Sequence, residues 1–302
     1  MMLSSREAYK HELTKLAYEH KDIIAIEADL GGKKHKFQQH HPSRFFNFGI
    51  AEMASLDICS GLTQGGFKPY FSTFAPFVAL RCAESIKLSL SYMEHNINIV
   101  SCYGGVSGGW FGTTHHCLED MSILSTLPNI KIACPHGEDE VRRVVRQSYF
   151  ETIPYYIRLY RNDAFKSIPN PDNKSFVIDG TFEKKNRVTL VSIGEISTEM
   201  CKEIKQNFNN INHVHLIYVD KNSIKNYTKE LNNLLKDQKV ITVEEHRETG
   251  SISNLLSTII ENNVIPFTPN DSYPHHGGTH DEVLDQLGFN KNNLLSLINE
   301  VE

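Results

Sequence analysis

Short β-rich runs alternate with longer helical patterns through the first half of the chain, and this alternation constrains the fold more than any other feature. The β-rich runs occupy residues 22–29, 68–74, 96–103, 129–135 and 154–160. The helical patterns between them occupy residues 51–63, 76–94, 117–127 and 138–149. Such alternation predicts a parallel sheet with helices on both faces. Ligands of open α/β sheets bind beside the carboxyl ends of the strands, so we expect a functional site at that edge.

The alternation resumes after a polar stretch, which predicts a second α/β domain. Residues 166–186 contain two prolines and little periodicity, as is typical of a linker. A length of 302 residues also agrees with two domains. We therefore predict two consecutive domains, residues 1–165 and residues 187–302, each a mainly parallel sheet flanked by helices.

Composition excludes several classes of protein. A net charge of −5 argues against a dedicated surface for nucleic acid or anionic membrane. The six cysteines are scattered without a Cys-x-x-Cys pair, which disfavours a zinc site and suits a reducing compartment. The beginning of the chain lacks the apolar core of a secretory signal, and no apolar run approaches the roughly 20 residues that span a bilayer. We therefore expect a cytoplasmic protein.

The sequence contains no complete motif for binding a nucleotide or a metal ion. The glycine-rich segments 61–68 and 104–112 contain neither G-x-G-x-x-G nor a phosphate loop with Gly-Lys-Ser/Thr, which disfavours a dinucleotide or ATP site. The histidine-rich stretch 274–280 has no metal-ligand spacing. We predict no metal ligand in this chain.

Two segments carry candidate acid–base residues. The stretch "NFGIAEMAS" places Glu52 at the start of a predicted helix, among small and apolar residues. An acid there can stabilise the helix through its macrodipole, or it can be a functional carboxylate. The stretch "TTHHCLED" follows the glycine-rich loop at the predicted ligand edge. His115 and His116 can begin a polar surface helix, or one of them can move a proton near neutral pH.

Aromatic and basic residues lie near the same predicted edge. The run "YFSTFAPF", residues 70–77, fits core packing and equally fits a planar slot for a heterocycle. Arg158 and Arg161 lie in or just after the last strand of the first domain. Arg161 can reach the ligand edge, where a guanidinium suits phosphate or carboxylate, or it can be a solvated surface charge.

Taken in this order, the segments resemble the second half of transketolase, from about residue 5 to the end. "NFGIAEMAS" is similar to the family's Gly-Ile-Ala/Arg-Glu motif, "YFSTFAPF" to its aromatic pocket, and "GTTHHCLEDMSILSTLPNIKIACP" to its Gly-x-Thr-His stretch and the next strand. "VEEHRETGSISNLL" and "GTHDEVLDQLGF" resemble its C-terminal domain. The motifs are specific for the superfamily and less specific for the reaction.

The resemblance implies that thiamine diphosphate is the cofactor. In the family, the Glu at the position of Glu52 hydrogen-bonds the pyrimidine ring and promotes the tautomer that removes the thiazolium proton. This requires a carboxyl group that holds its proton in a water-poor site. The resemblance further implies that Phe77 stacks on the pyrimidine, that Phe74 walls the pocket and that Ile50 contacts the cofactor. These implications favour a functional Glu52.

At the positions where the family binds its substrate, the residues of this chain match the family only in part. His115 matches the family's motif histidine, Arg161 its phosphate-binding arginine, and Arg6 a second such arginine. Tyr103, however, stands where transketolases usually place a histidine, and Phe111 replaces an aspartate that binds a donor hydroxyl. Because a ring cannot accept that hydroxyl's hydrogen bond, we expect a donor shorter than an ordinary ketose phosphate, or an unusual acceptor.

The chain lacks the Gly-Asp-Gly motif with which the family binds the diphosphate and Mg²⁺ or Ca²⁺. The resemblance therefore implies a split transferase in which a separate chain holds the metal and diphosphate, as an α2β2 heterotetramer. One alternative is the beta subunit of a 2-oxo acid decarboxylase or dehydrogenase component, although those proteins generally carry a His-Ser-Gln-Ser-like segment where this chain has "TTHHCLED". Another is a non-catalytic paralogue.

Overall fold

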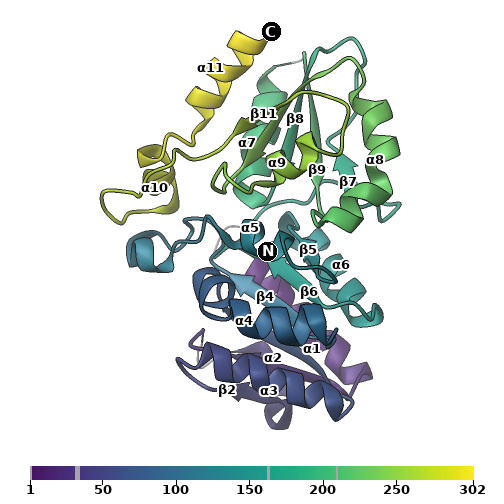
Figure 1. Ribbon diagram of the computed structural model, residues 1–302, viewed down its shortest axis with the longest axis vertical. Coiled ribbons are helices and arrows are strands. Elements are labelled where there is room, and N and C mark those ends of the chain that lie inside the picture. The colour runs from purple at the N-terminus through teal and green to yellow at the C-terminus, as the bar shows by residue number, and fades with distance from the viewer. Residues whose placement is uncertain (1, 31–34, 162–163, 209) are drawn as a thin grey trace.

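The chain forms two β-sheets that follow one another along the long axis of the molecule (Figure 1). The computed structural model describes residues 2–30, 35–161, 164–208 and 210–302. The first sheet has six parallel strands in the order β2-β1-β3-β4-β6-β5. The second has five strands in the order β11-β10-β8-β9-β7, of which only β7 is antiparallel to its neighbour. The predicted fold class is confirmed.

The strands are short and rich in β-branched and aromatic residues, and all except the edge strands β2 and β11 are largely buried, as a sheet covered on both faces requires. In the first sheet they are β1 (Ile23–Glu27), β2 (Phe45–Asn47), β3 (Lys68–Phe74), β4 (Asn98–Cys102), β5 (Lys131–Ala133) and β6 (Tyr155–Arg158). In the second they are β7 (Phe176–Ile178), β8 (Val188–Ile193), β9 (Ile211–Leu216), β10 (Lys239–Glu244) and β11 (Val264–Phe267).

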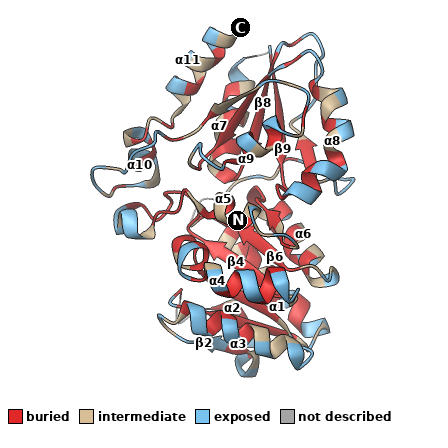
Figure 2. Ribbon diagram, in the orientation of Figure 1, coloured by how far each residue is buried: buried red, intermediate tan, exposed pale blue. Residues whose placement is uncertain are grey.

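Helices cover both faces of each sheet. Those of the first half are α1 (Ser5–Glu19), α2 (Lys36–His40), α3 (Glu52–Gln64), α4 (Ala83–Ser85), α5 (Asp120–Ser125) and α6 (Gly137–Phe150). Those of the second half are α7 (Glu195–Asn207), α8 (Lys221–Leu235), α9 (Ile252–Ser257), α10 (His280–Gln286) and α11 (Lys291–Val301). Several begin with a side-chain cap; Thr279 and Glu282, for example, form a capping box at the start of α10. Figure 2 shows that the inner strands of both sheets are buried while the outer faces of these helices are exposed.

Three predicted elements differ from the structure. The helix expected at 76–94 contains wide π-type turns at Phe77–Arg81 and Ile86–Tyr92 on either side of α4. The helix expected at 117–127 begins only at Asp120, because Cys117 N–H donates to the Gly105 carbonyl in an antiparallel bridge. The segment 166–186, predicted as a linker, contributes strand β7, which pairs with β9.

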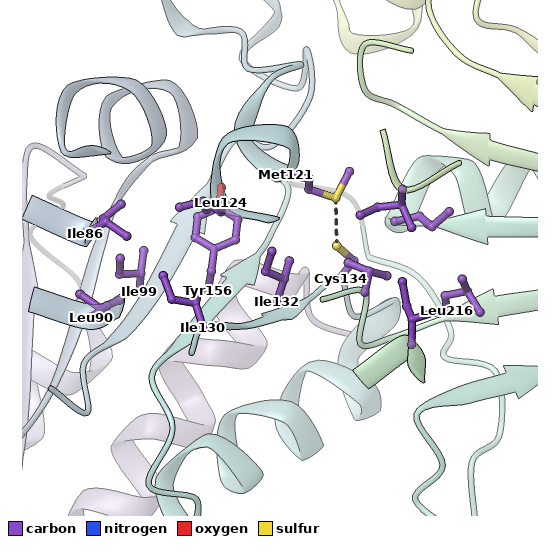
Figure 3. Close-up of a cluster of buried hydrophobic side chains, with 14 of the residues drawn as sticks. Ile86, Leu90, Ile99, Met121, Leu124, Ile130, Ile132, Cys134, Tyr156 and Leu216 are labelled. Carbon is purple, nitrogen blue, oxygen red and sulfur yellow. Dashed lines mark hydrogen bonds between the residues drawn. The ribbon is translucent and has the colours of Figure 1, made fainter. Parts of the chain in front are cut away.

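A single apolar cluster joins one face of both sheets (Figure 3). Its first-half members include Ile99 and Tyr156, and Cys134 lies between them and Leu216 of β9. A backbone hydrogen bond also joins the two halves: Cys134 N–H donates to the Ile217 carbonyl at 2.8 Å. The two halves are therefore packed against each other through a shared core.

The carboxyl ends of β1, β3 and β4 lie at one edge of the first sheet, because these strands are parallel neighbours. Two non-glycine residues just after strands have left-handed backbone there, Asp29 with φ 53° and Tyr103 with φ 62°. No helix among the described residues is long and apolar enough to cross a membrane.

Candidate functional site

A cluster of aromatic rings, called the aromatic pocket below, forms where β3 and β4 end. Phe74, the last residue of β3, stacks on Tyr103 with ring centroids 4.6 Å apart. The His115 ring meets Phe74 edge-on at 5.2 Å, Phe77 at 5.1 Å and Phe111 at 5.0 Å. The structure thus brings together five residues from three separate segments that the sequence analysis had singled out.

The backbone at Tyr103 aims its ring into this pocket. A left-handed conformation is uncommon for a residue with a side chain and clusters at functional sites. Here it ends β4 and lays the Tyr103 ring against Phe74 at an interplanar angle of 30°. Leu30, Phe74, Cys102 and Tyr103 form a small buried cluster, with Phe77 packed against it. The pocket floor is therefore apolar.

Glu52 lies buried at the start of α3, with 1% of its surface exposed. Its Oε2 accepts a hydrogen bond from Arg81 Nη1 at 2.5 Å, whereas Oε1 has no hydrogen-bond partner among the described residues. The preceding turn fixes its position: Gly49 has φ +67°, its N–H donates to Asn47 Oδ1, and Ala51 N–H donates to the Gly49 carbonyl. A buried polar atom without a partner is costly, so this oxygen can accept a hydrogen bond from a bound group.

Arg81 is a site residue that the sequence analysis missed. Its guanidinium carbon lies 4.5 Å from the centroid of the Phe77 ring, while its Nη1 pairs with Glu52. It therefore contacts two of the three residues implied to hold the cofactor's pyrimidine. Its spacing from Phe77 could have indicated this contact, because residues four apart on a helix lie on the same face.

Two arginines flank the ring of Tyr103. Arg6 Nη1 donates to the Tyr103 hydroxyl at 3.2 Å, and its guanidinium carbon lies 5.8 Å from the ring centroid. The Arg161 guanidinium carbon lies 5.3 Å from the Tyr103 centroid and 5.1 Å from that of Phe111. Two guanidinium groups beside one ring form a positive rim that suits a phosphate, sulfonate or carboxylate group.

His115 lies half-buried inside this rim. Burial lowers the pKa of the His115 ring, and nearby Asp29 opposes that shift without cancelling it. The ring is therefore neutral near pH 7 and can either accept or donate a proton. Its Nδ1 lies 2.9 Å from the Thr114 hydroxyl.

The other candidate site residues make structural contacts or lie on the surface. His116 is buried and its Nε2 lies 3.1 Å from the Gly109 carbonyl, so it supports the loop instead of facing the pocket. Arg158 is fully buried and donates from Nε to Asp120 Oδ2 at 2.8 Å. Ile50 is 75% exposed and lies on the surface beside Glu52. No group of three or more His, Cys, Asp or Glu residues in the described part of the chain could hold a metal ion.

The arrangement combines a buried carboxylate, an aromatic wall, a neutral histidine and a cationic rim at one sheet edge. Residues 1–165 match the transketolase pyrimidine-binding domain, so the chain belongs to the transketolase family.

Relatives of nearly the same length indicate which kind of transketolase-family protein this chain is similar to. One subunit of the apulose-4-phosphate transketolase of Phocaeicola vulgatus is 27% identical, with 96% of this chain and 95% of the relative aligned. A putative transketolase C-terminal section of Methanocaldococcus jannaschii is 26% identical, over 98% of this chain and 95% of the relative. The solved structure of a split gene transketolase, an inactive beta4 tetramer, superposes with a TM-score of 0.82 at 25% identity, covering 100% of this chain and 98% of that one. This chain is thus similar to one subunit of the split transketolases.

Proposed function

We propose that the chain is the subunit of a thiamine diphosphate-dependent transketolase-like enzyme that supplies the cofactor-activating glutamate. The reaction is transfer of a two-carbon unit from a 2-keto donor to an acceptor. The observation that carries the proposal is Glu52: a buried carboxylate whose Oε1 has no partner among the described residues, in a chain of the transketolase family.

The residues present fit the pyrimidine end of the cofactor. Glu52 Oε1 is available to a ring nitrogen, and Phe77 and Phe74 offer aromatic faces beside it. When bound, thiamine diphosphate supplies the carbanion stabilisation that the transfer needs. Glu52 would hold the proton that the pyrimidine nitrogen shares, and the apolar floor would exclude water from it. Binding of the metal and diphosphate is assigned to the partner chain.

The remaining pocket residues would bind the donor. His115, neutral near pH 7, would exchange a proton with the reacting oxygen of the substrate. Arg6 and Arg161 would bind an anionic group at the rim. Phe111, which packs beside Tyr103, presents a ring where a polyol donor would need a hydrogen-bond acceptor, and this favours a short donor such as pyruvate or hydroxypyruvate.

An apolar surface beside Glu52 supports the need for a partner chain. Phe46, Phe48, Ile50 and Met53 are each at least 40% exposed and lie on or just after β2, the edge strand of the first sheet. The rings of Phe46 and Phe48 are parallel, with centroids 6.1 Å apart. Contiguous exposed apolar side chains mark interaction surfaces. We assign this surface, named below the Phe46–Met53 surface, to the chain that binds the diphosphate, in an α2β2 heterotetramer of the cytoplasm.

The test is the variant Glu52→Gln in the assembled enzyme. The tagged chain is purified with its partner in magnesium buffer, thiamine diphosphate is added, and carbon dioxide release from hydroxypyruvate is measured. We expect activity to fall by about 100-fold or more, because the amide cannot hold the transferable proton.

The matched control is Glu12→Gln, which changes a carboxylate that is also buried and also paired with arginines, on α1. This variant should keep activity near that of the wild type. Normal turnover by Glu52→Gln would remove Glu52 from the catalytic role.

A further inference from the structure

We propose that Glu245, on the second sheet, is a positioning residue for the substrate pocket on the first. It acts on the pocket loop, defined as residues 104–112, which carries Phe111 and leads to His115. The part of the proposal that concerns substrate rests on the proposed function; the part that concerns the loop does not.

Glu245 reaches the pocket loop directly. It follows β10, its surface is fully buried, and its Oε1 accepts a hydrogen bond from the Val106 backbone N–H at 2.6 Å. The same oxygen lies 2.9 Å from His280 Nε2, at the start of α10. A side chain of the second sheet therefore binds the backbone of a loop that belongs to the first.

The loop has no room to move toward the second sheet. A Cβ atom on Gly105, whose φ is +62°, would lie 2.1 Å from Glu245 Oε1. A Cβ atom on Gly109, whose φ is +50°, would lie 2.6 Å from the Gly278 carbonyl oxygen. These two glycines let the loop backbone pack closely against the glutamate and against the turn before α10.

The opposite side of the loop is held from the first sheet. Gly104 N–H donates to the Leu159 carbonyl at 2.9 Å, and Cys117 N–H donates to the Gly105 carbonyl at 2.7 Å. Arg158 joins the two sides, because its Nη2 donates to the Glu245 carbonyl at 3.0 Å while its Nε binds Asp120. The loop is thus clamped between the sheets at residues 104–106.

Tight turns connect this clamp to the pocket. Gly109 N–H donates to the Val106 carbonyl, Phe111 N–H to Gly108, and Gly112 N–H to Gly109. His115 N–H then donates to the Gly112 carbonyl at 2.9 Å. A displacement at Val106 would consequently shift the rings of Phe111 and His115, which face each other at 5.0 Å.

The charge of Glu245 is maintained at neutral pH. Burial alone would raise the pKa of this carboxyl, but His280, Arg158 and the Val106 N–H together lower it. The ionised group makes a charge-assisted hydrogen bond to the loop, which is stronger than a neutral one.

The neighbouring Glu244 provides a matched control. It is equally buried, but its carboxylate accepts hydrogen bonds from the backbone N–H groups of Ile252 and Ser253 at the start of α9. Glu244 therefore stabilises a helix of its own domain and does not contact the pocket loop.

The test compares Glu245→Gln with Glu244→Gln and uses the single tryptophan as a reporter. Trp110 lies on the pocket loop, is 70% exposed and is the only tryptophan in the sequence. In the full chain we measure Trp110 fluorescence anisotropy and emission maximum; in the assembled enzyme we measure KM and kcat for hydroxypyruvate. We expect Glu245→Gln to lower the anisotropy and raise KM by about 10-fold with a smaller change in kcat. We expect Glu244→Gln to lower the unfolding temperature and to leave Trp110 anisotropy and KM unchanged.

His280→Asn is the second variant, used in case Glu245→Gln does not fold. It removes a hydrogen-bonding partner of Glu245, a histidine whose side chain is 12% exposed, and should change Trp110 anisotropy in the same direction. The inference is overturned if neither variant changes Trp110 anisotropy, or if Glu244→Gln changes it equally. The two proposals can fail separately. If the assembled wild type transfers no two-carbon unit, the proposed function is refuted. If Glu245→Gln still lowers Trp110 anisotropy, the loop-positioning role of Glu245 remains.

Discussion

Arg81 contacts two of the residues that we assign to the pyrimidine ring. Its guanidinium group pairs with Glu52 and lies 4.5 Å over Phe77, so both residues already have a partner in the chain. Its side chain is 45% exposed, whereas that of Glu52 is 1% exposed. Arg81 can therefore leave for water at modest cost, while Glu52 cannot, and a ring that replaces Arg81 would satisfy the same buried carboxylate.

Arg81→Ala should separate cofactor affinity from stability. Without the competing guanidinium, we expect the assembled enzyme to bind thiamine diphosphate at least roughly two- to five-fold more tightly. Displacing even a surface ion pair costs up to about 1 kcal/mol, and one partner of this pair is buried. The free chain should unfold at a lower temperature, because Glu52 then loses its partner. Calorimetric titration and thermal unfolding measure the two effects.

Arg81→Lys is the matched control, because it keeps the charge but not the planar group over Phe77. It should lie between the wild type and Arg81→Ala in cofactor affinity. Weaker cofactor binding by Arg81→Ala would mean that Arg81 supports the bound cofactor instead of standing in for it.

Among the elements, strand β9 carries the group that makes the second sheet sensitive to acid. His213 is completely buried on this strand, with Nε2 2.8 Å from the Ser192 hydroxyl and Nδ1 3.2 Å from Asp179 Oδ2. Burial lowers the pKa of His213 to about 4, although Asp179 opposes the shift. The folded chain therefore binds no proton at His213 until the pH is well below the ordinary histidine value of 6.5.

The free energy of unfolding should consequently fall as the pH is lowered from about 6.5 to about 4. In this range the unfolded chain binds a proton at residue 213 and the folded chain does not, so acid favours unfolding, by up to about 3 kcal/mol. Urea unfolding of the wild type and of His213→Asn across this range measures the contribution. His213→Asn should have a shallower dependence on pH, and parallel curves for the two proteins would exclude His213 as the source.

At the scale of the whole molecule, an exposed apolar surface lies beside the site, on the side where a partner is expected. The aromatic pocket is closed toward the second sheet by the pocket loop, and Glu245 holds that loop in place. Toward the edge strand β2, the chain instead presents the Phe46–Met53 surface to solvent. Because exposed apolar side chains can also favour self-association, a second copy of this chain is the alternative occupant that an assembly experiment must distinguish.

Ile50→Asp should prevent assembly with the diphosphate-binding chain without unfolding the protein. Ile50 is 75% exposed, so a carboxylate there costs the free chain little but would be buried and unpaired in an apolar interface. Affinity purification from the native host, followed by mass spectrometry, should recover a chain with Gly-Asp-Gly together with the wild type and not with the variant.

Phe150→Asp is the control, because Phe150 is 64% exposed at the end of α6 and is not part of the Phe46–Met53 surface. It should still recover the partner. Light scattering of the free chain reports whether Ile50→Asp also abolishes self-association. Normal recovery of the partner by Ile50→Asp would place the interface elsewhere.

The local sequence determined the elements and the edge at which the pocket residues gather. Alternating β-rich and helical patterns predicted the parallel sheets, because periodicity and strand composition are local properties. For Arg161, which follows the last strand of the first domain, one of two interpretations placed the guanidinium at the ligand edge, and it lies 5.3 Å from the Tyr103 ring centroid. The resemblance, and not strand position, assigned Phe74 and Tyr103 to the site. The resemblance to transketolase added the role of Glu52, which its local surroundings had left open between a helix-stabilising acid and a functional carboxylate.

Only the tertiary structure decided which side chains complete the pocket. Cys117 looked like the start of a helix, but its N–H pairs with Gly105, twelve residues earlier, and this contact moves the helix start to Asp120. Glu245 lies 139 residues from Val106 in the chain, so no local pattern could indicate that it holds the pocket loop. Hydrogen bonds and packing between distant segments depend on how the two sheets dock, and that docking is a property of the folded core they share.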